Sequence, residues 1–319
     1  MTPPNCSVHS DATEVSVAIL LVVEFGLGLL GNAIALWAFF FRLKVWKPHT
    51  VYLFNLVIAD LLLTICLPFR IAFYLRHKVW SFGHRSCQSL LFLLSLSRGV
   101  GVAFLTAVAL DRYCRVVHPR LKVNLVSPQW ARVISGCVWL LMMTLTHQSL
   151  FISKAAGNTT ECRSFDPSEE FSLRIIWQEA LFFLQFVLPF GLILFCNVGI
   201  IKTLQKILRD PEKQPKLRRA KALVTAVVVL FGLCFSPSFV ARILMDVFRR
   251  SESCRMRRMV ENTLDVASSL SYLNSVLNPI IYCFSNPTFR YSYKKVFNTL
   301  RGRRQEVEPP DCDPNDSYS

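Results

Sequence analysis

An arginine at position 98 lies in the middle of a strongly apolar stretch, SLSRGVGVAFL. The segments CQSLLFLL and TAVAL flank this stretch. A charge at the centre of a bilayer costs about 2.5–3.5 kcal/mol on insertion scales, so it needs a partner. The planar guanidinium group offers two parallel N–H donors that match the two oxygens of a carboxylate. Arg98 is therefore a candidate for binding a carboxylate ligand.

An internal ion pair is the alternative role for Arg98. The acidic residues that could reach it are Glu24, Glu179 and Asp265, each within another apolar segment or near its end. Intramembrane charges usually mark functional sites, which favours the ligand. The two roles are compatible, because a ligand could displace an internal carboxylate.

Four further residues are candidates for the same site. Arg242, in FVARILMDV, is a second anion donor, although Asp246 follows four residues later and could pair with it on a helix. Arg70 could either reach the site or extend toward the membrane surface. Tyr272 and Ser269 could donate hydrogen bonds to a carboxylate or a hydroxyl group.

Catalytic and metal-binding patterns are absent from the sequence. It contains no HExxH and no GxSxG. Cys114 and His118 are four residues apart but have no further ligands nearby, which argues against a zinc site. We therefore expect neither an enzyme nor a metal or other cofactor.

The apolar residues that surround these candidates occur in long blocks. The chain has 319 residues, of which 52% are hydrophobic, and a mean hydropathy of +0.38. A transmembrane helix needs about 20 mostly apolar residues. The blocks are 16–41, 50–75, 87–112, 130–152, 173–201, 221–248 and 261–284. They predict an all-α membrane protein with a seven-transmembrane helix bundle over residues 16–284.

Basic residues predict the orientation of this bundle. They cluster after the first, third, fifth and seventh blocks, which places those connections and residues 285–319 in the cytoplasm. Residues 1–15 are then extracellular, and the glycosylation sequons at Asn5 and Asn158 fall outside. This distribution of the +15 net charge indicates a lipid bilayer as partner and excludes nucleic acid.

Cysteines agree with this orientation. Cys6, Cys87, Cys162 and Cys254 fall in the outer, oxidising compartment. Four cysteines allow three pairings, and the residues alone do not choose between them. On the cytoplasmic side, Cys312 is a candidate for fatty acylation.

Polar residues inside the blocks predict a buried cluster. Asn32, Asp60 and Asn278 belong to the first, second and seventh blocks and must point into the bundle. The cluster could hold the helices together, or it could switch between two packings. At the end of the third block, Asp111 is placed to neutralise Arg112.

These motifs together resemble those of rhodopsin-like (class A) G-protein-coupled receptors. The series is GN (31–32), LVIAD (56–60), DRY (111–113), Trp139, Pro189, CFSP (234–237), NPIIY (278–282) and the amphipathic FRYSYKKVF (289–297). Within that family the chain is most similar to hydroxycarboxylic acid and oxoeicosanoid receptors. The stretches VWKPHTVYLFNLVIADLLL, VGVAFLTAVALDRYCRVVHPRLKVN and EKQPKLRRAKALV carry this likeness.

The resemblance implies roles for particular residues. It implies disulfides Cys87–Cys162 and Cys6–Cys254, a carboxylate anchor at Arg98, and an eighth helix on the inner leaflet. The implied activation switch consists of Asp60, Asp111, Arg112, Tyr113, Phe235, Pro237, Asn278, Pro279 and Tyr282. The chain departs from the family at Phe235, where most members have tryptophan, and at Gly101, where a serine usually accompanies the sodium site.

The resemblance also implies a function. It implies a plasma-membrane receptor for an anionic lipid such as a hydroxy-eicosanoid, coupled to a heterotrimeric G protein of the Gi/o class, with arrestin as a further partner. The alternative ligands are short hydroxy- or keto-carboxylates such as lactate or pyruvate. A transporter of organic anions is a remote alternative, because the chain shows no repeated halves.

Overall fold

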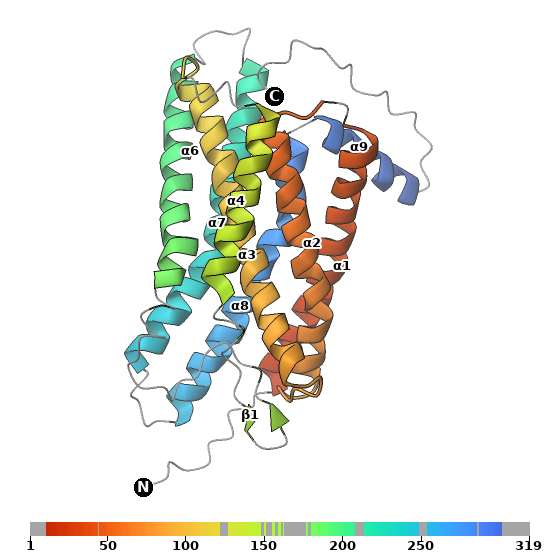
Figure 1. The fold of residues 1–319 in the computed structure, drawn as a ribbon, viewed down its shortest axis with the longest axis vertical. Coiled ribbons are helices and arrows are strands. Elements are labelled where there is room, and N and C mark those ends of the chain that lie inside the picture. The colour runs from red at the N-terminus through yellow and green to blue at the C-terminus, as the bar shows by residue number, and fades with distance from the viewer. Residues whose placement is uncertain are drawn as a thin grey trace.

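Figure 1 shows the fold in a computed structural model, which describes residues 11–43, 45–121, 127–147, 150, 155–156, 159–160, 162, 177, 180–207, 214–248, 254–285 and 287–301. The long helices are α1 (Asp11–Phe41), α2 (Pro48–Leu75), α3 (His84–Val117), α4 (Pro128–Thr146), α6 (Leu188–Ile207), α7 (Gln214–Phe248) and α8 (Cys254–Ser285). A π-helical segment, η3 (Phe183–Val187), precedes α6, and α9 (Pro287–Leu300) follows α8. The strands β1 (Ala155–Ala156) and β2 (Thr159–Thr160) form an antiparallel pair.

The seven predicted apolar blocks all coincide with long helices, and local sequence explains where two of these begin. Pro48 and Pro128 occupy the first turns of α2 and α4, where a missing N–H removes no helical hydrogen bond. At α4, the Ser127 hydroxyl also accepts a hydrogen bond from the Trp130 N–H at 3.4 Å. The fourth block was predicted to extend to residue 152, whereas α4 ends at Thr146.

The helices form a closed bundle. Helix α1 packs against α2 and α8, α2 packs against α3, α3 packs against α6, and α7 packs between α6 and α8. Helix α4 lies against α2 and α3. The bundle has two distinct ends (Figure 1): β1, with the start of α3, lies at one, and α9 lies at the other. We call them the disulfide end, after the bridge that joins Cys87 of α3 to Cys162, and the α9 end.

Several helices have the length and composition of membrane spans. Within the described residues, Ala12–Phe41, Pro48–Leu75, His84–Val117 and Ala180–Lys206 meet both criteria, and Phe231–Leu244 is a shorter apolar helix. The surface of the bundle is correspondingly apolar. Ile19, Phe40 and Leu233 are each more than 60% exposed.

Polar residues occupy the interior instead. Asn32, Asp60 and Asn278 are at most 1% exposed. An apolar exterior around a polar interior is the arrangement expected for helices in lipid, because each polar group there needs an internal partner.

Candidate functional site

Arg98 extends from α3 toward α8 and is half-buried. Its Nη1 donates a hydrogen bond to the Ser271 hydroxyl of α8 at 3.2 Å. Its guanidinium carbon lies 5.7 Å from the ring centroid of Tyr272 and 5.9 Å from that of Phe186 in η3. Two aromatic rings and one hydroxyl therefore surround the guanidinium group, and cation–π attraction contributes to holding it inside the bundle.

Among the described residues, no carboxylate forms an ion pair with Arg98. Glu24 is fully buried in α1, and neither of its carboxylate oxygens has a hydrogen-bond partner in the described part of the chain. Asp265 pairs with Lys78 instead. Neither of these two candidate partners therefore pairs with Arg98 in this structure. Glu179 lies outside the described residues.

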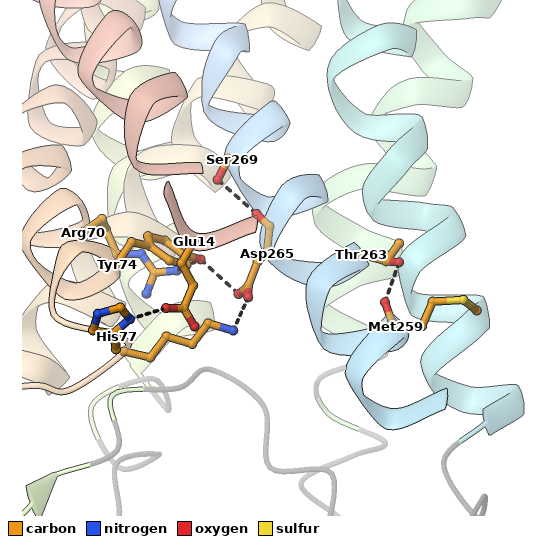
Figure 2. A network of polar contacts seen from close by, with 9 residues as sticks. Glu14, Arg70, Tyr74, His77, Met259, Thr263, Asp265 and Ser269 are labelled. Carbon is orange, nitrogen blue, oxygen red and sulfur yellow. Dashed lines mark hydrogen bonds and ion pairs between the residues drawn. The ribbon is translucent and has the colours of Figure 1, made fainter. Parts of the chain in front are cut away.

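A polar network joins α2 to α8 nearer the disulfide end (Figure 2). The Asp265 carboxylate lies 2.6 Å from Lys78 Nζ and accepts a hydrogen bond from the Tyr74 hydroxyl at 3.0 Å. Arg70 Nη2 in turn donates to the Tyr74 hydroxyl at 3.3 Å. We call Arg70, Tyr74, Lys78 and Asp265 the Lys78 cluster. Arg70 therefore turns into the bundle, as expected for a site residue, rather than toward the lipid.

The Lys78 cluster is connected to neighbouring groups on two sides. His77 Nδ1 lies 3.1 Å from a carboxylate oxygen of Glu14, which adds α1 to the network (Figure 2). On the other side, Arg70 interacts with the hydroxyl of Tyr272, the residue whose ring faces Arg98. Polar contacts thus extend from the disulfide end toward Arg98.

The remaining ligand candidates lie in different places. The guanidinium carbon of Arg242 is 4.2 Å from the ring centroid of Phe182, and the side chain of Asp246 lies outside the described residues. The Ser269 hydroxyl donates to the backbone oxygen of Asp265 at 3.0 Å (Figure 2). Ser271, rather than Ser269, is therefore the serine that contacts Arg98.

Aromatic rings connect the surroundings of Arg98 to the deeper part of α7. Phe186 lies 5.2 Å from Phe235, and Phe235 lies 4.3 Å from Phe231, between ring centroids. Phe190 stacks on Phe231 at 5.3 Å. We call Phe186, Phe235, Phe231 and Phe190 the aromatic column. It includes the phenylalanine that stands where most family members have tryptophan.

The predicted buried polar cluster is present at the centre of the bundle. Asp60 accepts hydrogen bonds from Asn278 Nδ2 at 3.0 and 2.9 Å and from the Tyr282 hydroxyl at 2.8 Å. Asn32 Nδ2 donates to the backbone oxygen of Ser275 at 3.1 Å. These bonds join α1, α2 and α8, next to the kink-inducing Pro279.

The DRY motif lies near the α9 end. The Asp111 carboxylate accepts from Arg115 Nε at 2.9 Å, four residues along the same helix and on the same face. Asp111 also attracts the Arg112 guanidinium group electrostatically, as the sequence suggested. Tyr113 contacts His118, with 3.4 Å between its hydroxyl and Nε2.

The cysteine and glycosylation predictions are partly covered by the structure. Cys87 and Cys162 form a disulfide, as the family resemblance implied. Cys6, Asn5 and Asn158 lie outside the described residues, as does the side chain of Cys254. Their pairing and modification therefore stay predictions.

Three contributors to the site were not predicted from the sequence, namely Ser271, Phe186 and Lys78. Ser271 had one available signal. Residues three and four positions apart share a helix face, so the face that carries Ser268 and Tyr272 also carries Ser271. Lys78 lies just beyond the apolar block 50–75, where a lysine is ordinarily expected in solvent.

Comparison with known proteins identifies the group to which these features belong. The model of the 7 transmembrane receptor (rhodopsin family) matches residues 31–282, which is most of the chain. This range includes Arg98, the aromatic column, Asp60 and the DRY and NPIIY motifs.

Similar proteins have names that refer to acidic ligands. The human 12-(S)-hydroxy-5,8,10,14-eicosatetraenoic acid receptor is 63% identical, over 99% of each chain. Human hydroxycarboxylic acid receptor 2 is 39% identical over 96% of this chain and 84% of that protein. Human oxoeicosanoid receptor 1 is 35% identical over 95% of this chain and 78% of that protein.

Proposed function

Because this chain belongs to the rhodopsin family of seven-transmembrane receptors, we propose that it is a cell-surface receptor for an anionic hydroxylated lipid, of the 12-hydroxyeicosatetraenoic acid type. It is a receptor and not an enzyme. Relatives over the full chain length support the ligand class, since their names refer to hydroxy-eicosanoid, hydroxycarboxylic and oxoeicosanoid ligands.

The observation that carries this proposal is the Arg98 guanidinium group. It is half-buried, and no described carboxylate pairs with it. A carboxylate ligand would neutralise this charge and accept two parallel hydrogen bonds from it. The low dielectric constant of the interior strengthens this interaction, because fewer water dipoles compete for either charge.

The adjacent aromatic column favours a lipid over a short carboxylate. Phe186 contacts Arg98 on one side and Phe235 on the other. Burying apolar ligand surface contributes about 25 cal/mol per Å². An eicosanoid chain gains this term where it packs on Phe186, whereas lactate or pyruvate has almost no apolar surface to bury. Short hydroxy- and keto-carboxylates remain the second ligand class, favoured by the hydroxycarboxylic acid receptors among the relatives.

The membrane arrangement belongs to the same proposal. Seven helices cross the plasma membrane, with the disulfide end and the amino terminus outside and α9 along the inner leaflet. The amphipathic sequence of α9 supports this placement. The α9 end, which carries the DRY motif, then faces the G protein, of the Gi/o class, and arrestin.

Ligand binding would act by shifting the populations of two packings of the bundle. A ligand that binds Arg98 and presses on Phe186 changes the contact between Phe186 and Phe235 of α7. Because Pro237 interrupts the hydrogen bonding of α7 one turn or less from Phe235, the helix can bend there. Movement of α7 at the α9 end then exposes a surface for the G protein.

The test is a G-protein activation assay on cells that express the wild type, Arg98→Ala or Arg98→Lys at matched surface levels. The ligands are 12-hydroxyeicosatetraenoic acid, its methyl ester and lactate. We expect the acid alone to activate the wild type strongly, and Arg98→Ala to reduce its potency by roughly 100-fold, equivalent to a lost buried charge pair of about 2.7 kcal/mol. Arg98→Lys keeps the charge without the bidentate geometry and should fall between the two.

Two results would contradict the proposal. Equal potency of the acid on the wild type and Arg98→Ala would show that Arg98 is structural. A stronger response to lactate than to the eicosanoid acid would reassign the receptor to short carboxylates.

A further inference from the structure

Lys78 forms a buried ion pair at the disulfide end of the bundle. Its side chain is 5% exposed, against 21% for that of its partner Asp265. A buried charge that loses its partner costs several kcal/mol unless another group of opposite charge replaces the partner. Lys78 therefore favours the presence of an anion at this position, whichever molecule supplies it.

The turn that carries Lys78 has an uncommon backbone conformation. His77 and Lys78 have φ angles of 52° and 61°, in the left-handed region that residues with a Cβ rarely adopt. Such a conformation persists only where the surroundings hold it, and it is concentrated at functional sites. Here the two side chains bind acids on two other helices, Glu14 of α1 and Asp265 of α8.

The groups around the Asp265 carboxylate are the groups that a ligand carboxylate needs. Lys78 supplies an ammonium group at 2.6 Å, and Tyr74 supplies a hydroxyl donor at 3.0 Å. Arg70 stands behind Tyr74, and no described acid pairs with its guanidinium group. Figure 2 shows Arg70 and Tyr74 on the same side of Asp265. Within the Lys78 cluster, Asp265 is the one acid among two cations and a phenol.

The cluster is also continuous with the Arg98 site. Arg70 interacts with the hydroxyl of Tyr272, and the ring of Tyr272 faces the Arg98 guanidinium at 5.7 Å. A carboxylate that leaves Lys78 would therefore meet Arg70 and then Arg98, with a cation or a phenol at each step. A series of like-charged groups of this kind steers an anion along its length.

We propose that Arg70, Tyr74 and Lys78 form an outer docking site for the carboxylate of the incoming ligand, and that Asp265 occupies this site in the ligand-free receptor. The ligand exchanges with Asp265 at Lys78 before its carboxylate reaches Arg98. This inference rests on the proposed function, since it assumes an anionic ligand held at Arg98.

The exchange has a kinetic signature that separates it from a structural role. Charges outside the final contact mainly change the association rate constant, whereas charges in the final contact change the dissociation rate constant. Removing Asp265 leaves the docking site open, so the acid should associate faster. Removing Lys78 deletes the site, so the acid should associate more slowly. A simple tie between α2 and α8 would be broken by both changes, which would then act in the same direction.

The experiment measures association and dissociation of tritium-labelled 12-hydroxyeicosatetraenoic acid on membranes that contain each receptor variant. We expect Asp265→Asn to raise the association rate constant roughly threefold to tenfold and Lys78→Gln to lower it by a similar factor. Both should leave the dissociation rate constant within about twofold of the wild type. Arg98→Ala should instead accelerate dissociation.

Glu14→Gln is the matched control, because it removes one negative charge at the same end without changing the Lys78 pair. An increase in association as large as that of Asp265→Asn would assign the effect to the general field and overturn the proposal. Slower association or faster dissociation in Asp265→Asn would also overturn it, as a structural tie. If Asp265→Asn fails to reach the membrane, Lys78→Gln decides alone: unchanged association refutes the docking site.

The failure of this proposal can be told apart from the failure of the proposed function. If Arg98→Ala accelerates dissociation while the Asp265 and Lys78 variants bind at the wild-type rates, the ligand site stands and the docking site does not. If Arg98→Ala binds like the wild type, the anchor itself is wrong.

Discussion

Single residues near Arg98 illustrate what side-chain chemistry alone could predict. Arg98 was identified because a charge in an apolar segment requires a partner, and that requirement does not depend on the fold. The choice between Ser269 and Ser271 could not be made in this way. It depends on the rotation of α8 relative to α3, which the packing of the whole bundle determines. The structure places Ser271 at 3.2 Å from Arg98, whereas Ser269 bonds within its own helix.

Gly31 is a residue where the absence of a side chain is required. A Cβ at this position would lie 2.8 Å from Cγ of Pro279, which is a rigid ring on α8. We therefore expect Gly31→Ala to lower the free energy of unfolding by about 1–3 kcal/mol through overpacking. The measurement is the thermal unfolding midpoint of the purified receptor. Gly26→Ala is the control, because a Cβ there meets no atom within 4 Å. A midpoint for Gly31→Ala equal to that of Gly26→Ala would refute the steric argument.

The Tyr282 hydroxyl makes a second prediction at this scale. It donates to Asp60 at 2.8 Å, and both residues are at most 1% exposed. Tyr282→Phe leaves the Asp60 carboxylate with Asn278 and Ser275 as its donors among the described residues, and a lost buried hydrogen bond costs about 1–3 kcal/mol. We expect a lower unfolding midpoint of the ligand-free receptor. In the Asp60→Asn background the same substitution should cost less, since the acceptor is no longer charged. Equal costs in both backgrounds would contradict the assigned bond.

At the scale of elements, hydropathy predicted the long helices well but missed a π-helical segment and the end of one helix. All seven apolar blocks correspond to helices, because apolar composition is local information. The π-helical turn of η3 was not predicted, although it brings Phe186 toward Arg98. A π-helical turn arises from an extra residue within a helix, and hydropathy has no term for it. The length of α4 was likewise overestimated.

Helix α9 gives the prediction that belongs to this scale. Its sequence predicted an amphipathic helix, and the structure adds a specific attachment: the Tyr293 hydroxyl donates to the backbone oxygen of Gly31 in α1 at 2.6 Å. We expect Tyr293→Phe to loosen α9, so that its backbone amides exchange with deuterium several-fold faster while those of α3 are unchanged. Tyr291→Phe is the control, since Tyr291 forms a cation–π interaction with Arg42 that phenylalanine keeps. Unchanged exchange in α9 would show that the bilayer, or the packing of Phe289 on Phe39 of α1, holds the helix instead.

For the whole molecule, the question is how binding at the proposed Arg98 site is transmitted to the α9 end. Two buried groups lie between them: the aromatic column along η3, α6 and α7, and the Asp60 cluster that joins α1, α2 and α8. The column touches the Arg98 site directly through Phe186, whereas no contact in the described part of the chain joins Arg98 to Asp60. We therefore assign the first step of coupling to the column.

Phe235 is the residue that tests this assignment, because it links Phe186 to Phe231 at 5.2 and 4.3 Å. Phe235→Leu keeps an apolar side chain but loses ring contacts worth about 0.5–1.5 kcal/mol each. Among the described rings, Phe186 is the one that joins Phe235 to the Arg98 site. We expect the affinity for the eicosanoid acid to change by less than about threefold, while maximal G-protein activation falls severalfold, because coupling and binding are separate free energies. Leu233→Ala is the control on the same helix, with a side chain 66% exposed on the lipid-facing surface. If Phe235→Leu instead loses affinity and keeps full activation, Phe235 is a wall of the ligand site, and coupling must pass through the helices that surround Asp60.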